Sequence, residues 1–93
     1  MRESDIEDYL VKRVNAMGGE VRKVKWIGRR GAPDRLVMLE HPQHETSITA
    51  WVELKAPGKK PKPHQAREHE RMRAMGQHVL VIDSLAGVEE LLG

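Results

Sequence analysis

Residues 48–55 read ITAWVELK and end in Glu53-Leu54-Lys55. Side chains alternate along a strand with a period of two, so Glu53 and Lys55 lie on the same face. A neighbouring expected strand, residues 34–40 (DRLVMLE), begins with Asp34 directly after Pro33. Carboxylates at the ends of two neighbouring strands can bind a hard divalent cation. A lysine beside them reaches the metal's water or a phosphate, so the pattern predicts metal-assisted phosphodiester hydrolysis. A turn-capping Asp and a solvated Glu-x-Lys pair are the alternatives.

The rest of the chain alternates between helical and strand patterns. A capping box at residues 4–7 (SDIE) opens a first helix, and Gly18-Gly19 ends it. The remaining expected elements are a strand at 20–26, the strands at 34–40 and 48–55 joined by a polar hairpin loop at 41–47, a helix at about 64–75, a strand at 78–82 and a last helix through Leu92 capped by Ser84 or Asp83. The order α-β-β-β-α-β-α predicts a mixed α/β fold, with an antiparallel meander followed by a helical crossover to a fourth strand.

Length and composition limit the class of protein. A chain of 93 residues predicts one small domain, and the absence of Phe predicts an aliphatic core that oligomerisation would help to stabilise. There is no Cys, which excludes disulfides and thiolate metal sites and fits a reducing compartment. The first ten residues, MRESDIEDYL, contain no apolar stretch that would suit a signal peptide or a membrane span. We therefore expect a cytoplasmic protein that does not bind membranes.

The formal net charge is only +2, but the basic residues are not spread evenly along the chain. Basic residues form two clusters, Arg22, Lys23, Lys25, Arg29, Arg30 and Arg35, and then Lys59, Lys60, Lys62, Arg67, Arg71 and Arg73. Basic clusters around acidic strand ends favour a polyanion held beside a metal ion, although a generic soluble surface gives the same composition.

The histidines do not form a recognisable zinc site. His41 and His44 have a suitable spacing but no third ligand nearby in the sequence. His64 and His69 are five residues apart in an expected helix, so they do not share a face.

Five segments occur in a specific order: residues 3–7 (ESDIE), 31–35 (GAPDR), 52–58 (VELKAPG), Gln65, and 76–81 (GQHVLV). This order resembles the PD-(D/E)xK nuclease superfamily, and more closely a stand-alone VRR-NUC domain of the phage type, over essentially the whole chain. The resemblance implies a single domain at 1–93 with a restriction-endonuclease-like αβββαβα core and a mixed four-stranded sheet. It also implies a Mg²⁺- or Mn²⁺-dependent DNA endonuclease without a small-molecule cofactor, which acts as a homodimer on branched DNA such as Holliday junctions.

The resemblance also implies roles for individual residues. Asp34 and Glu53 would bind the metal, with the backbone carbonyl of Leu54 completing the protein ligands. Lys55 would orient or deprotonate the attacking water, or offset charge in the transition state. Glu7 is the expected first-helix acid, as ligand and catalytic group, and Glu3 is its rival. Gln65 would reach toward the catalytic lysine or the metal's waters.

Two basic loops are the expected DNA contacts. These contacts are Arg29, Arg30 and Arg35 around the catalytic Asp, and Lys59, Lys60 and Lys62 on a loop stiffened by proline. Trp26 and Trp51 are expected in the core or at an interface, with Trp51 on the strand face of Glu53. Two alternatives stay open, a flap- or end-processing nuclease and a non-catalytic basic DNA-binding protein whose acidic residues only stabilise the fold.

Overall fold

The computed structural model describes residues 1–40 and 47–93. The elements follow in the order α1 (Glu3–Ala16), β1 (Glu20–Lys23), β2 (Arg35–Glu40), β3 (Ser47–Leu54), α2 (Pro63–Ala74), β4 (Val79–Ile82) and α3 (Leu85–Leu92). This is the expected order α-β-β-β-α-β-α. The expected hairpin loop, with His41 and His44, lies outside the described residues except for Ser47, which begins β3. No helix in the described part of the chain is long and apolar enough to cross a membrane.

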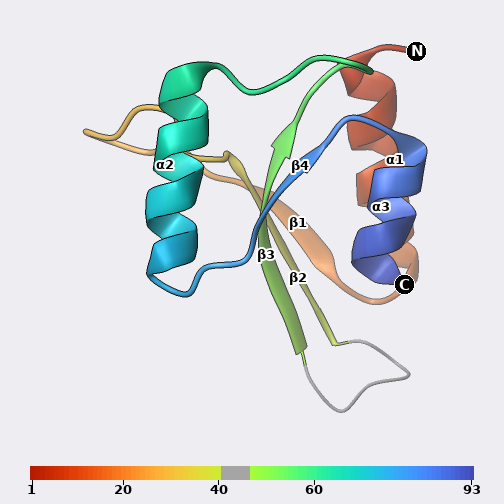
Figure 1. Ribbon diagram of the computed structural model, residues 1–93. Helices are drawn as coiled ribbons and strands as arrows, with labels where there is room; N and C mark the ends of the chain where they lie inside the picture. Colours follow the sequence, from red (N-terminus) through yellow and green to blue (C-terminus); the bar gives the residue numbers. More distant parts are fainter. Residues whose placement is uncertain (41–46) are drawn as a thin grey trace.

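The strands form a four-stranded mixed sheet in the order β1-β2-β3-β4. The pairs β1–β2 and β2–β3 are antiparallel, whereas β3–β4 is parallel and requires the crossover that α2 provides. Helix α2 covers one face of the sheet, and α1 and α3 cover the other (Figure 1). The antiparallel meander and the crossover predicted from the sequence are therefore confirmed.

The core lies between the sheet and the pair α1 and α3, and it is aliphatic as expected. Its buried members are Ile6, Leu10, Val14, Val37, Leu39, Val52, Leu54, Ile82, Val88 and Leu92. Strand β3 sends Val52 and Leu54 into this core. Because side chains alternate along a strand, Trp51 and Glu53 point to the opposite face, where α2 packs. The alternation along β3 thus places Val52 and Leu54 in the core and Glu53 on the opposite face of the sheet.

Several element boundaries differ from the sequence predictions. Helix α1 begins at Glu3, and the backbone N–H of Arg2 donates to Oδ2 of Asp5 at 2.7 Å. The capping box predicted at residues 4–7 is therefore wrong, and Glu7 is not needed as a cap. Strand β1 ends at Lys23 instead of continuing to Trp26. Of the two caps proposed for the last helix, Ser84 is correct, since its hydroxyl accepts from the N–H of Gly87 at 2.9 Å.

Candidate active site

The loop between β1 and β2 is held against the start of α2, and this contact positions Asp34. Gly31 has a φ of +85°, and a Cβ at this position would lie 2.9 Å from the carbonyl oxygen of His64. Only glycine can approach another backbone so closely in this conformation. Further along, the indole N–H of Trp26 donates to the carbonyl oxygen of the buried Pro33 at 2.8 Å. Asp34 follows directly and precedes β2 at the edge of the sheet.

Glu53 is the buried acid of the site. It lies one residue before the end of β3, and its side chain is 12% exposed. Burial raises its pKa from 4.5 to about 6, although the positive charge of Lys55 opposes this shift. The negative charges of Asp34 and Glu3 raise the pKa further. These acids are therefore close enough to repel one another, which is the situation that a bound cation relieves.

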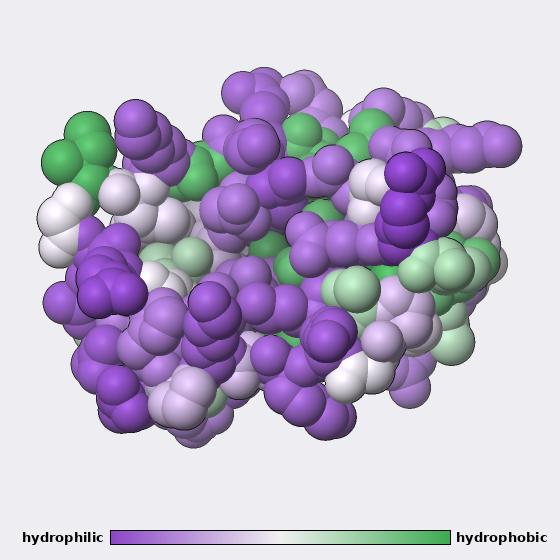
Figure 2. All heavy atoms as spheres, turned by 90° about the horizontal axis from the view of Figure 1, so that it is seen from above, coloured by the Kyte–Doolittle hydropathy of each residue, from purple (hydrophilic) through white to green (hydrophobic). Residues whose placement is uncertain are grey.

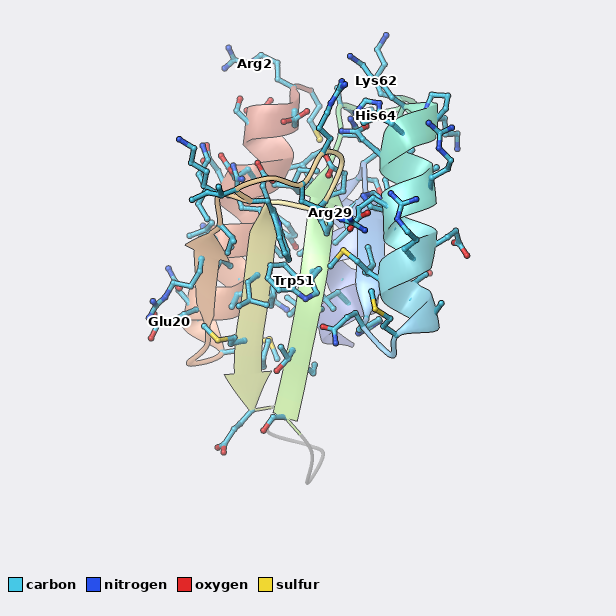
Figure 3. The ribbon with its side chains drawn as sticks, turned by 90° about the vertical axis from the view of Figure 1, so that its left-hand side faces the viewer. Arg2, Glu20, Arg29, Trp51, Lys62 and His64 are labelled. Carbon is cyan, nitrogen blue, oxygen red and sulfur yellow. The ribbon has the colours of Figure 1, made fainter. Side chains whose placement is uncertain are left out.

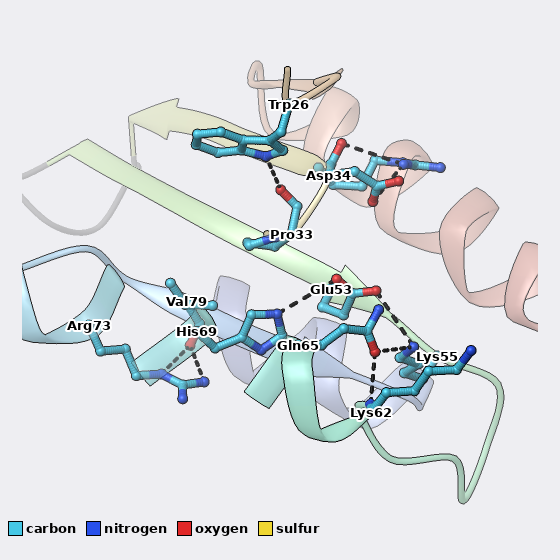
Figure 4. A network of polar contacts seen from close by, with 11 residues as sticks. Trp26, Pro33, Asp34, Glu53, Lys55, Lys62, Gln65, His69, Arg73 and Val79 are labelled. Carbon is cyan, nitrogen blue, oxygen red and sulfur yellow. Dashed lines mark hydrogen bonds and ion pairs between the residues drawn. The ribbon is translucent and has the colours of Figure 1, made fainter. Parts of the chain in front are cut away.

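Lys55 lies between Glu53 and α2 (Figure 4). Its Nζ is 3.8 Å from Oε2 of Glu53 and donates to Oε1 of Gln65 at 3.0 Å. The same oxygen of Gln65 accepts from the backbone N–H of Lys62 at 2.8 Å, at the start of α2. The structure thus brings Lys55 and Gln65 together, and one amide oxygen both caps the helix and holds the lysine.

The two candidate acids of α1 lie one helical turn apart and contact the site in different ways. Glu7 accepts a hydrogen bond from Nε of Arg35 at 2.7 Å and also contacts the terminal Nη2 of that guanidinium. Glu3 influences the site through its negative charge, which raises the pKa of Glu53. This effect is smaller than that of burial. The choice between Glu7 and Glu3 as a functional acid stays a prediction.

Two of the arginines expected to contact DNA are engaged by carboxylates. Arg35 is largely buried, and its Nη1 lies 2.9 Å from Oδ1 of Asp34 while Glu7 binds the other side of the guanidinium. Arg29 forms an ion pair of 3.0 Å with the buried Glu68 of α2. Arg35 thus balances two acids of the site, and Arg29 anchors the loop. A phosphate contact by either residue would compete with these ion pairs.

Other basic side chains are exposed near the start of α2. Arg30, Lys59, Lys60 and Lys62 are all exposed. Burial lowers the pKa of His64, and the charges of Arg30, Lys62 and Arg67 lower it further, which shows that positive charge gathers around this histidine. Arg2, Lys62 and His64 lie at the same end of the molecule in Figure 3. Figure 2 shows that hydrophilic side chains cover most of the face seen from above.

His69 is a functional candidate that the sequence did not predict. His69 is 1% exposed, and its Nε2 lies 3.7 Å from Oε1 of Glu53. Burial lowers the pKa of His69, followed by the charge of Arg73. The sequence carried one usable signal, because His69 follows Gln65 by four residues and so lies on the same face of the helix.

The acids of the site have the chemistry of a hydrated cation site. Asp34 and Glu53 supply carboxylate oxygens, which hard cations prefer. Within residues 1–40 and 47–93, no group of three or more His, Cys, Asp or Glu side chains is arranged to hold a metal ion. A cation here would therefore rely on few protein ligands and keep several waters, which is the usual mode of Mg²⁺. The residues present fit such an ion.

Comparisons with known proteins agree with this arrangement. The chain is 48% identical over 84 residues to the protein named "Putative nuclease p44" of Acyrthosiphon pisum secondary endosymbiont phage 1, and the match covers 90% of this chain and 85% of that one. A solved structure described as a VRR_NUC domain matches with a TM-score of 0.80 and 43% identity, over 97% of this chain and 92% of the other. No family profile matches the sequence. The restriction-endonuclease-like fold is thereby confirmed, and the chain belongs to the VRR-NUC family of nucleases.

Proposed function

We propose that this nuclease is a Mg²⁺- or Mn²⁺-dependent DNA endonuclease, formed as one domain by residues 1–93, that cleaves branched DNA as a homodimer. One arrangement carries the proposal. A buried carboxylate, Glu53, lies between the charge of Asp34 and the ammonium group of Lys55, which Gln65 holds at 3.0 Å. This grouping supplies oxygen ligands and a positioned cationic donor at one point on the surface. The cytoplasmic location expected from the sequence stays a prediction.

Asp34, Glu53 and the backbone carbonyl of Leu54 are the proposed metal ligands, with Glu7 or Glu3 as the further acid. A bound divalent cation supplies Lewis-acid activation of water and of the phosphate. Before the ion binds, Arg35 balances the charges of Asp34 and Glu7 through its ion pairs. With a cation held by these carboxylates, the guanidinium of Arg35 would be free to bind a DNA phosphate.

Lys55 is the proposed catalytic residue beside the ligands. Its ammonium group can orient or deprotonate the attacking water, or stabilise charge that develops on the phosphate in the transition state. Gln65 restricts the lysine to this position because its oxygen is itself fixed by the backbone of Lys62. A donor that is already oriented does not need to reorganise during the reaction.

The exposed basic residues form the proposed DNA surface. Lys59 and Lys60 lie on the loop that follows β3, Lys62 precedes α2, and Arg30 lies on the loop that carries Asp34. Their side chains lie next to the acids in the sequence and are exposed. Positive charge on both sides of the acids would hold a phosphate backbone over them without reading its sequence.

An apolar patch beside this surface is the proposed dimer interface. Ile27 is 93% exposed and Met75 is 70% exposed. They line an open pocket of about 450 Å³ whose walls include Trp26 and Trp51, with ring centroids 5.1 Å apart. A two-fold interface needs a surface that is complementary to itself. A protruding Ile27 beside an apolar pocket meets this requirement, because each copy can place its Ile27 in the pocket of the other. The Val52 side of β3, by contrast, is buried in the core.

Cleavage assays with and without metal test the catalytic proposal. We expect cleavage of a four-way junction in Mg²⁺ or Mn²⁺, slower cleavage of a flap or plain duplex, and none in excess EDTA. Preference for the flap would favour the end-processing nuclease. Tight DNA binding with no cleavage under any metal condition would favour the non-catalytic DNA-binding protein. Full activity in EDTA would exclude metal dependence.

Solution mass and cruciform cleavage test the dimer. We expect twice the chain mass and linear products from a supercoiled cruciform in one binding event. Ile27→Asp should give a monomer that only nicks the cruciform. Thr49→Asp adds the same charge at an exposed position of β3, and it should leave the dimer intact. A wild-type monomer at micromolar concentration would contradict the proposed assembly.

A further inference from the structure

The imidazole of His69 connects the two segments that carry the candidate metal ligands. The ring is almost completely buried on the inner face of α2. It hydrogen bonds to the backbone of Gly31, in the loop that leads to Asp34. On the other side, its Nε2 lies 3.7 Å from Oε1 of Glu53 on β3 (Figure 4). One rigid ring therefore faces both the loop of one carboxylate and the side chain of the other.

The Nε2 atom has no hydrogen-bond partner in the described part of the chain. Buried polar atoms in native proteins are nearly always paired, and an unpaired atom is costly and calls for an explanation. Here the atom that Nε2 faces is an oxygen of Glu53, and a shift of less than 1 Å would bring the pair to the usual length of about 2.7–3.2 Å. The proton of such a hydrogen bond must lie on Nε2, because a carboxylate that binds a cation is deprotonated. The pair thus has the placement of an outer-shell contact that tightens when the carboxylate binds an ion.

The loop that carries Gly31 packs closely against the start of α2. Gly31 approaches the backbone of Gln65 so closely that its missing Cβ would lie 3.0 Å from the Cα of that residue. The loop therefore cannot slide along α2 without breaking this contact. Gln65 also holds Lys55, and one helical turn later His69 places its Nε2 3.7 Å from Oε1 of Glu53.

We propose that His69 is a positioning residue for the metal site, which sets the orientation of the Glu53 carboxylate and ties it to the loop of Asp34. The inference rests on the proposed metal-dependent function. Outer-shell partners of metal-binding carboxylates orient the ligand, and their loss typically costs about 10- to 100-fold in metal affinity or activity. His69 does not touch the substrate or the metal in this proposal and acts only through Glu53.

Three substitutions separate the contacts of the ring. His69→Gln places an amide nitrogen near the position of Nε2 and can still reach Glu53. His69→Asn instead places its amide near the nitrogen that bonds Gly31 and is too short to reach Glu53. His69→Leu keeps the bulk and removes both polar contacts. Met72→Leu is the control, because it changes another buried position of α2 and conserves side-chain volume.

Mn²⁺ affinity, measured by EPR on the DNA-free protein, is the main readout, with thermal stability of the metal-free protein alongside. We expect His69→Asn and His69→Leu to bind Mn²⁺ about 10- to 100-fold more weakly. We expect His69→Gln to stay within about threefold of wild type, since it restores the contact to Glu53. Met72→Leu should bind like wild type.

The outcomes distinguish this inference from the proposed function. If wild type binds Mn²⁺ and His69→Leu binds it equally well, the positioning role is overturned and the metal site stands. Equal losses in the Gln and Asn variants would also overturn it, because the contact to Glu53 would then not matter. If His69→Leu does not fold, the Gln and Asn pair still decides. If wild type binds no Mn²⁺, the proposed metal dependence fails, and this inference fails with it.

Discussion

Lys55 and Gln65 lie on different elements, yet Nζ of the lysine donates to Oε1 of the glutamine at 3.0 Å. The lysine follows the last residue of β3, and the glutamine lies in the first turn of α2. The same amide oxygen accepts the N–H of Lys62 at 2.8 Å. The position of the proposed catalytic lysine therefore depends on how α2 begins.

Substitution of Gln65 tests this dependence. Gln65→Ala should destabilise the protein by about 1 kcal/mol, the typical cost of removing a helix cap. It should also lower the cleavage rate by up to about 100-fold, because a misplacement of about 1 Å can cost that much. Gln65→Glu retains a capping oxygen and should restore the stability. Its added charge pairs with Lys55, so the rate should stay low. Stability is measured by urea unfolding and rate by single-turnover cleavage.

Substitution of Lys55 separates its two proposed roles. Lys55→Ala should reduce the cleavage rate by about 10²- to 10³-fold while leaving DNA binding intact, because it removes a group that stabilises the transition state. Lys55→Arg keeps the charge but cannot act as a base, since a guanidinium does not lose its proton in proteins. Substantial activity of the Arg variant would indicate charge stabilisation, and its absence would indicate proton transfer. An Ala variant with near wild-type rate would show that Lys55 is only a surface charge.

Local patterns in the sequence predicted much of the fold and part of the site. The alternation of residues 48–55 placed Glu53 and Lys55 on one face, and the structure agrees because a period of two is a property of the strand itself. The contacts of Arg35 and His69 could not be predicted in this way. Arg35 of β2 meets Glu7 of α1, and His69 of α2 meets Glu53 of β3, so each contact joins two elements that are distant in the sequence. Such contacts depend on how the whole core packs.

The start of α1 is a second feature that the local sequence pattern did not predict correctly. Residues 4–7 match a capping box, but Asp5 accepts the backbone N–H of Arg2 and the helix begins at Glu3. Arg2 is not a residue type preferred at an N-cap, so the local rule favoured the wrong start, and local patterns place a helix end only to within about one or two residues.

Glu53→Gln should make the metal-free protein more stable and inactive. The pKa of Glu53 is about 6 in the folded protein against an ordinary 4.5, so the folded state holds its proton more tightly. Its contribution to stability is therefore complete below pH 4.5 and is lost as the pH rises through 6. The loss corresponds to about 2 kcal/mol above neutral pH. The Gln variant avoids it, so its gain should appear at pH 8 and vanish near pH 4.

Urea unfolding at both pH values measures this gain, with Glu90→Gln, an exposed position of α3, as the control. Added Mg²⁺ should stabilise the wild type and leave the Gln variant unchanged, because the variant lacks the ligand. Equal stability of wild type and Glu53→Gln at pH 8 would contradict the burial argument.

Neutralising the loop lysines should weaken DNA binding in a salt-dependent way. Replacing Lys59, Lys60 and Lys62 by Gln removes positive charges that would bind phosphates and release counterions whatever the DNA sequence. The slope of log affinity against log salt should become less steep by about 0.9 for each duplex phosphate that is no longer neutralised, or up to about 2.7 for all three lysines. Lys12→Gln, at an exposed position of α1, should leave the slope unchanged. An unchanged slope in the triple variant would show that this loop does not touch DNA.

Gly31→Ala should destabilise the protein and impair metal binding more than Gly18→Ala, although both substitutions introduce the same backbone strain. Gly31 and Gly18 have φ values of +85° and +84°, so alanine is strained at both positions. That strain costs about 1–2 kcal/mol. At Gly18 nothing lies within 4 Å of an added Cβ, whereas at Gly31 the Cβ would meet the carbonyl oxygen of His64 at 2.9 Å. Backbone atoms cannot yield as a flexible side chain can, so the loop must move away from α2.

Movement of this loop would displace Asp34 and break the hydrogen bond of Gly31 with His69. We therefore expect Gly31→Ala to lose more stability than Gly18→Ala in urea unfolding, and to lose Mn²⁺ binding and cleavage as well. Gly18→Ala should lose only the stability that its backbone strain explains and should cleave DNA like wild type when fully folded. If both variants lose the same stability and keep the same Mn²⁺ affinity, the packing of this loop on α2 does not position Asp34.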